Sequence, residues 1–206
     1  MEGLLAGSRH AAGWLLIAGG MLAIVGAFWP PYAQWSSPLE PSLRIIHAHP
    51  IGWRCIHAGF ASGTVVSTLG LALLAYALRG RTGGGHALLV AVLWSTGAVF
   101  WIANIAIRLG VTPWAAAELV RAGSLPGGYA AWRAFERLLF AAFAVLAYAS
   151  VAGLGWTVLR GALAPAWTGW LLVAWGATGG FVVGANVPFV AYVPLVIVGG
   201  FLVRGG

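Results

Sequence analysis

Lysine and aspartate are both missing from this 206-residue chain, and its only acidic residues are Glu2, Glu40, Glu118 and Glu136. Without lysine there can be no retinal Schiff base and no lysine-dependent phosphate loop. Without aspartate there can be no aspartyl-phosphate nucleophile and no metal clamp of paired aspartates. A G-x-S-x-G nucleophile motif is also lacking, and the single cysteine, Cys55, cannot form an intramolecular disulfide. Several common catalytic chemistries are therefore excluded.

Positive charge is present in excess, but in a scattered form. All 11 basic residues are arginines, and the net charge is +7. They lie singly near the ends of apolar segments, without a basic run or an RNA-binding motif. We therefore expect no nucleic-acid partner.

Long apolar runs dominate the chain, which is 61% hydrophobic and 7% charged, with a mean hydropathy of +0.91. Because about 20 apolar residues cross a bilayer, this pattern predicts an all-α integral membrane protein, a single transmembrane domain over residues 1–206. Six spans are predicted, the last two short and joined by a tight turn at residues 184–186: Ala11–Trp29, His57–Leu78, His86–Ile107, Leu138–Leu159, Trp167–Gly184 and Val187–Val203. Tryptophans near span ends are typical interfacial anchors, namely Trp29, Trp35, Trp53, Trp114, Trp132 and Trp167.

Arginine counts on the two sides of these spans are nearly equal, so they do not fix the orientation. The short basic turn at residues 79–85 is simple, whereas the segments 30–56 and 109–132 are long enough to be structured. Since inner loops are usually the plain ones, we expect a cytoplasmic N-terminus in the cell (inner) membrane. Both long segments would then face the extracytoplasmic side.

An internal repeat is visible in the sequence. Trp53-Arg54-Cys55-Ile56-His57 resembles Trp132-Arg133-Ala134-Phe135-Glu136, and Thr96-Gly97 followed by Asn104 resembles Thr178-Gly179 followed by Asn186. This predicts a duplicated helical hairpin, with copies over roughly residues 50–108 and 129–188, that forms a pseudo-twofold four-helix bundle from the second to fifth spans. Ligand sites of membrane bundles tend to lie at such repeat interfaces. Small residues should allow close packing of these helices, including Gly59, Gly63, Gly97, Gly153 and Gly179.

The repeat brings polar positions to one side of the membrane. His57 and Glu136 enter their spans at equivalent depth, and Asn104 and Asn186 return to that depth. Helical spacing adds Arg54 three residues before His57, Arg133 three before Glu136 and Arg108 four after Asn104. We therefore predict an extracytoplasmic cofactor-binding pocket made of the following residues: His57, Glu136, Asn104, Asn186, Arg54, Arg133 and Arg108.

Simpler roles compete with this pocket. Arg133 and Glu136 could form an ion pair at a helix start, near the positive end of the helix dipole. Arg54 could anchor its guanidinium in the lipid phosphate layer, and the two asparagines could only hold helices together.

Three of the five histidines, His47, His49 and His57, lie within eleven positions. In an extended chain His47 and His49 would point to the same side, and with His57 and Glu136 they would suit a transition metal. A single haem b held by His57, with His47 or His49 as the second ligand, is the competing prediction. A quinone is the third cofactor that we consider.

The segment His49-Pro50-x-x-Trp53-Arg54-x-x-His57 leads into a Gly/Ala/Leu-rich span that ends in Leu-Arg. It resembles uncharacterised bacterial multi-pass membrane proteins that carry a domain of unknown function. This resemblance covers about one helix and implies a multi-pass fold but no activity.

Together these features predict an accessory or anchoring subunit of a larger membrane assembly, of a redox or electron-transfer kind. Its partners would be the lipid bilayer and either other membrane subunits or further copies of the chain, since apolar residues surround several spans. The alternatives are a small-solute transporter or channel, supported by the Gly- and Pro-interrupted last two spans, and a membrane enzyme acting on a lipid or a quinone.

Overall fold

The protein is an all-α bundle in the computed structural model, which describes residues 2–28, 38–182 and 188–205. Four helices are long and apolar enough to cross a membrane. The predicted all-α membrane class is therefore confirmed. The elements are α1 (Glu2–Ala27), α2 (Leu39–Ala48), α3 (Pro50–Ala77), α4 (Gly84–Ala122), α5 (Tyr129–Gly161), α6 (Ala166–Val182), the 3₁₀ turn η3 (Pro188–Ala191) and α7 (Val193–Arg204).

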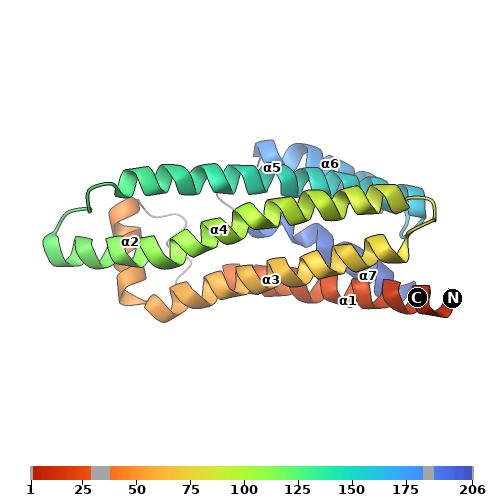
Figure 1. Ribbon diagram of the computed structural model, residues 1–206, viewed down its shortest axis with the longest axis horizontal. Coiled ribbons are helices and arrows are strands. Elements are labelled where there is room, and N and C mark those ends of the chain that lie inside the picture. Colours follow the sequence, from red (N-terminus) through yellow and green to blue (C-terminus); the bar gives the residue numbers. More distant parts are fainter. Residues whose placement is uncertain (1, 29–37, 183–187, 206) are drawn as a thin grey trace.

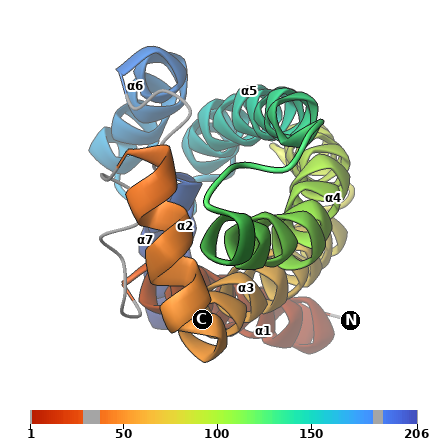
Figure 2. The same ribbon diagram turned by 90° about the vertical axis from the view of Figure 1, so that its left-hand side faces the viewer.

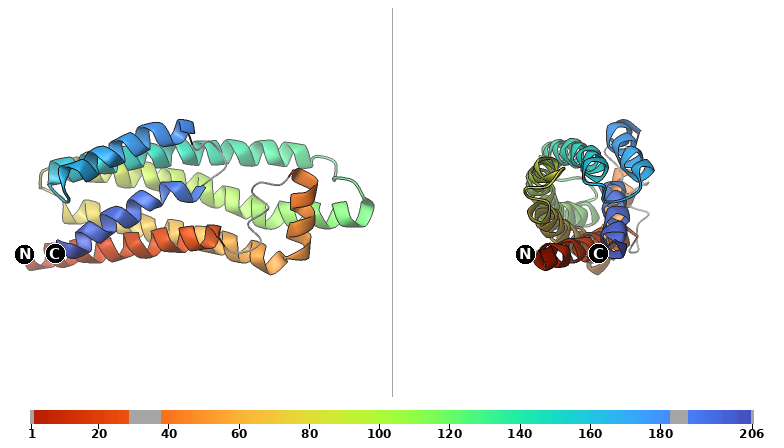
Figure 3. Two further views of the ribbon diagram at one scale, coloured as in Figure 1. Left: turned by 180° about the vertical axis from the view of Figure 1, so that it is seen from behind. Right: turned by 90° about the vertical axis from the view of Figure 1, so that its right-hand side faces the viewer.

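All described α-helices except α2 run along the bundle and surround its axis, as the end view shows (Figure 2): α1, α3, α4, α5, α6 and α7. Helix α3 packs between α1 and α4, α5 packs between α4 and α6, and α7 packs on α1. The start of α1, the end of α7 and the α3–α4 turn lie at one end of the bundle (Figures 1 and 3). The short α2 crosses the other end and packs on α4.

Three helices are longer than the apolar spans that the sequence predicts. Helix α3 begins at Pro50, not at His57, α4 continues to Ala122 through Pro113, and α5 begins at Tyr129. With a rise of 1.5 Å per residue, the 39 residues of α4 extend about 58 Å, nearly twice the hydrocarbon thickness of about 30 Å. Much of segment 109–132 is therefore a continuation of α4 and α5, and these helices extend beyond the edges of the predicted spans.

Glycines set the closest helix contacts, as predicted. A Cβ on Gly63 of α3 would lie 2.6 Å from the carbonyl oxygen of Gly19 on α1, and one on Gly59 would lie 3.0 Å from the Cα of Gly26. A Cβ on Gly97 or Gly153 would also meet side chains of a facing helix, at 3.2 and 2.9 Å. Backbones that approach this closely gain packing contacts along their length.

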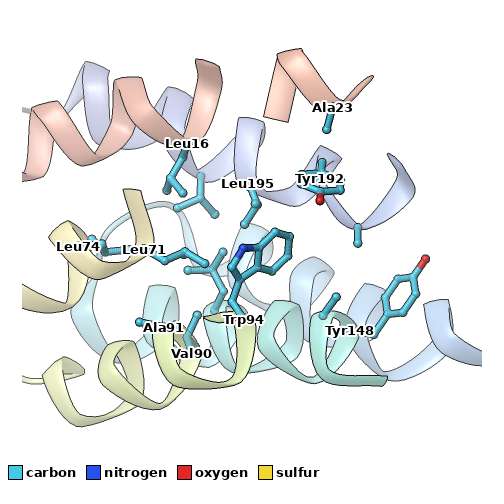
Figure 4. Close-up of a cluster of buried hydrophobic side chains, with 14 of the residues drawn as sticks. Leu16, Ala23, Leu71, Leu74, Val90, Ala91, Trp94, Tyr148, Tyr192 and Leu195 are labelled. Atoms are coloured by element: carbon cyan, nitrogen blue, oxygen red, sulfur yellow. The ribbon is translucent and has the colours of Figure 1, made fainter. Parts of the chain in front are cut away.

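The core between the helices is apolar and aromatic (Figure 4). Trp94 of α4 and Tyr192, next to α7, lie with their rings 5.3 Å apart and nearly perpendicular. The hydroxyls of Tyr192 and Thr64 are hydrogen-bonded at 2.6 Å. A smaller second core lies beneath α2, where Leu43 and Ile46 pack with the far end of α4.

The proposed repeat corresponds to the hairpins α3–α4 and α5–α6. Helix α6 has 17 residues, less than half the length of its counterpart α4. Asn186 and the predicted turn at 184–186 lie outside the described residues. The pseudo-twofold relation of the two hairpins therefore stays a prediction.

Candidate functional site

A buried polar layer joins α3, α4 and α5 near the α2 end of the bundle. We use the name polar layer for His57, Asn104, Arg108 and Glu136. An ion pair connects two of them, with 2.6 Å between Arg108 Nε and Glu136 Oε1. The two side chains are only 18% and 11% exposed, so this pair is largely buried.

Asn104 and Arg108 both reach Glu136 because they lie one turn apart on the same face of α4. The Asn104 side-chain amide donates to the backbone carbonyl of Glu136 at 2.7 Å. This interhelical pairing joins three of the predicted site residues. Four-residue spacing in the sequence was sufficient to predict the shared face.

Trp53 connects α3 to the same layer. Its indole N–H donates to the backbone carbonyl of Arg108 at 2.9 Å, and its ring lies 4.2 Å from that of His57. Trp53 is 5% exposed, so its predicted role as an interfacial anchor is wrong. The anchor pattern depends on contact with lipid, whereas α4 covers this side chain.

His57 is fully buried, one turn deeper in the bundle than Trp53. Its Nδ1 lies 2.8 Å from the Trp53 carbonyl oxygen. Its Nε2 and the Oδ1 of Asn104 have no hydrogen-bond partner among the described residues. Since buried polar atoms are normally paired, these two atoms on neighbouring helices are available to a hydrogen-bond donor.

Two further side chains extend the layer toward the α4–α5 connection. Tyr129 lies close to Thr112, and Arg133 lies close enough to act electrostatically on both Tyr129 and Arg108. Sequence reasoning missed Thr112 and Tyr129. Helical spacing could have identified both residues, because Thr112 follows Arg108 by one helical turn and Tyr129 precedes Glu136 by two turns.

The predicted ion pair of Arg133 with Glu136 at a helix start is replaced by the Arg108–Glu136 pair. Helix α5 begins at Tyr129, so Glu136 lies two turns inside it rather than near its positive end. Arg54 is exposed on α3 while His57 points inward, and the two therefore do not share a face as predicted. Asn186 lies outside the described residues.

The predicted metal ligands His47, His49 and His57 are not brought together. His47 lies in α2 and His49 caps it, so the extended conformation assumed for this pair is wrong. Both are exposed, whereas His57 is buried. Within residues 2–28, 38–182 and 188–205, no group of three or more His, Cys, Asp or Glu side chains is placed to hold a metal ion.

The polar layer lies at the edge of the apolar part of the bundle. About 20 residues of α3 separate His57 from the α3–α4 turn, and about 20 residues of α4 separate that turn from Asn104, each about 30 Å of helix. This is the thickness of a hydrocarbon core. If the α3–α4 turn lies at one membrane face, the layer lies just inside the other.

Aromatic rings form the floor of the layer on the membrane side. Phe60 and Trp101, one turn deeper than His57 and Asn104, lie with ring centroids 5.4 Å apart. Trp101 also stacks on Phe143 at 5.0 Å, with an angle of 14° between the rings. The polar atoms are thus separated from the remaining core by π-systems.

Comparison of this chain with protein-family models, with curated proteins and with solved structures gave no match.

Proposed function

We propose that the protein is an accessory or anchoring subunit of a larger redox assembly in the cell (inner) membrane, and that its polar layer binds a quinone headgroup. The observation that carries this proposal is the pair of unpartnered buried atoms, His57 Nε2 and Asn104 Oδ1, next to the buried Arg108–Glu136 ion pair. Ionisable residues buried in membrane helices are costly and by default functional.

The position of the layer suits a lipid-soluble ligand with a polar head. A quinone ring has polar atoms on opposite edges and flat apolar faces, and its tail remains in the bilayer. The layer offers polar groups above an aromatic floor at the edge of the hydrocarbon region. The ion pair retains some exposure, so this part of the layer reaches the surface.

The donor set favours a quinone over a metal or a haem. A transition-metal site needs several converging ligands, which the described residues do not supply. A haem with two axial histidines needs a second buried histidine, but the other four are exposed.

The proposed subunit role is supported by the apolar outer surface. Large side chains that are more than half exposed lie on the three longest helices, including Val65, Leu69, Leu88, Val99, Leu138 and Val145. Lipid and apolar partner helices would both cover such a surface. With a cytoplasmic N-terminus, the basic α3–α4 turn would also be cytoplasmic, because it lies at the same end as the start of α1.

The test is the quinone content of protein purified in mild detergent, measured by solvent extraction and chromatography. We expect about one quinone per chain in the parent protein. The control variant His86→Ala, which changes an exposed histidine at the other end of the bundle, should retain it, whereas His57→Ala and Glu136→Gln should lose it at equal folded yield. Equal quinone content in the parent and all three variants, or no quinone in any of them, would refute quinone binding at this layer. A monodisperse monomer without partners in membrane cross-linking would refute the subunit role.

A further inference from the structure

The position of the proton on His57 is fixed by its neighbour. A backbone carbonyl can only accept a hydrogen bond, so the 2.8 Å contact between Nδ1 and the Trp53 oxygen requires an N–H at Nδ1. Full burial of the ring disfavours the charged imidazolium. The ring is therefore neutral, and Nε2 carries a lone pair and no hydrogen.

The orientation of the Asn104 amide is fixed in the same way. The Glu136 carbonyl only accepts, so the NH₂ group of Asn104 must face it, at 2.7 Å. The unpartnered atom, Oδ1, is then an acceptor as well.

The two acceptors belong to one level of the bundle. The Trp53–Arg108 hydrogen bond joins α3 and α4 one turn above, and the Phe60–Trp101 ring contact joins them about one turn below. Because α3 and α4 are antiparallel, His57 and Asn104 occupy the turn between these two contacts. Both side chains are fully buried there.

From this chemistry we infer that the polar layer selects the reduced, hydroxyl-bearing hydroquinone over the oxidised quinone. The inference rests on the proposed function and names the redox state that the site takes. A hydroquinone brings two O–H donors, which Nε2 of His57 and Oδ1 of Asn104 can accept. A quinone brings only carbonyl acceptors, which can pair with a donor such as the Arg108 guanidinium but would leave both of these atoms without a partner. A binding site discriminates strongly between two ligands when one of them leaves the buried polar groups of the site without a hydrogen bond.

The experiment compares ligands on the unchanged protein, so no variant has to fold. Tetramethyl-1,4-benzoquinone, its hydroquinone and the dimethyl ether of that hydroquinone are titrated anaerobically into protein stripped of native quinone, and binding is followed by calorimetry. We expect the hydroquinone to bind about tenfold more tightly than either other compound, the difference for about one buried hydrogen bond.

Variants then locate the preference. Asn104→Leu and His57→Phe each remove one acceptor and should reduce the ratio of hydroquinone to quinone affinity, whereas His86→Phe should leave it unchanged. The inference would be overturned, with quinone binding left in place, if the unchanged protein bound the quinone as tightly as the hydroquinone or more tightly. It would also be overturned if Asn104→Leu and His57→Phe both kept the full preference for the hydroquinone. Binding of none of the three compounds, together with no quinone in the purified protein, would overturn both.

Discussion

The Arg108–Glu136 ion pair should be a principal stabilising contact between α4 and α5, and Glu136→Gln is the change that tests it. The substitution conserves shape and removes only the negative charge. Arg108 would then keep its positive charge in a site where it is 18% exposed. The charge of Arg133 also acts on it and is repulsive.

Loss of one partner from a buried ion pair typically costs about 3–5 kcal/mol, because the remaining charge is uncompensated. The partial exposure of Arg108 places this case near the lower value, about 3 kcal/mol. For a chain of this size, 1 kcal/mol corresponds to roughly 2–4 °C in Tm. We therefore expect Glu136→Gln to lower the Tm by roughly 6–12 °C.

The assay is thermal unfolding in one detergent, followed by tryptophan fluorescence and helical circular dichroism. The matched control is Glu118→Gln, because Glu118 forms an exposed i,i+3 ion pair with Arg121 on the same helix as Arg108. Exposed pairs of this kind contribute little, so the control should leave the Tm nearly unchanged. Arg133→Gln should also have a small effect.

Two results would refute this reasoning. If Glu136→Gln and Glu118→Gln gave equal small shifts, the Arg108 charge would be solvated rather than buried. If instead Arg133→Gln were as destabilising as Glu136→Gln, the partner of Glu136 would be the residue on its own helix.

Other contacts predict further outcomes. Gly63→Ala should lower the Tm, at a cost of about 1–3 kcal/mol, since its Cβ would collide with the backbone of α1, whereas Gly110→Ala in α4 meets nothing within 4 Å and should be neutral or slightly stabilising. Tyr192→Phe removes the hydrogen bond to Thr64 and should cost about 0.6–1.7 kcal/mol in chemical denaturation, with no further loss when combined with Thr64→Val. Trp53→Phe removes the indole donor to the α4 carbonyl and should increase hydrogen exchange in the α2 end of α4, while exchange near the α3–α4 turn stays unchanged.

Much of the polar layer was predictable from helical spacing. Asn104 and Arg108 are four residues apart and do share a face of α4, and both meet Glu136. This prediction succeeded because positions within a straight helix are fixed by its geometry alone. The apolar runs predicted the four long apolar helices for the same local reason, whereas α6 and α7, at the fifth and sixth predicted spans, have only 17 and 12 residues.

Predictions that depended on the surroundings of a side chain were less successful. Trp53 fits the pattern of an interfacial anchor, but the packing of α4 over α3 buries it. His47 and His49 suited an extended metal motif, but α2 folds there because Leu43 and Ile46 can pack against α4. Span edges based on hydropathy mark where the hydrocarbon ends, whereas α3, α4 and α5 continue as helices beyond it.

The unpartnered acceptors argue against a purely structural polar layer. A buried polar atom without a hydrogen bond costs about 1–3 kcal/mol, and the layer contains two, on His57 and Asn104. The single hydrogen bond that Asn104 makes to α5 contributes only about 0.6 kcal/mol in a typical membrane bundle. Apolar residues at these two positions would hold α3, α4 and α5 together at lower cost. The cost of these two acceptors therefore supports the proposal that they bind a hydrogen-bond donor.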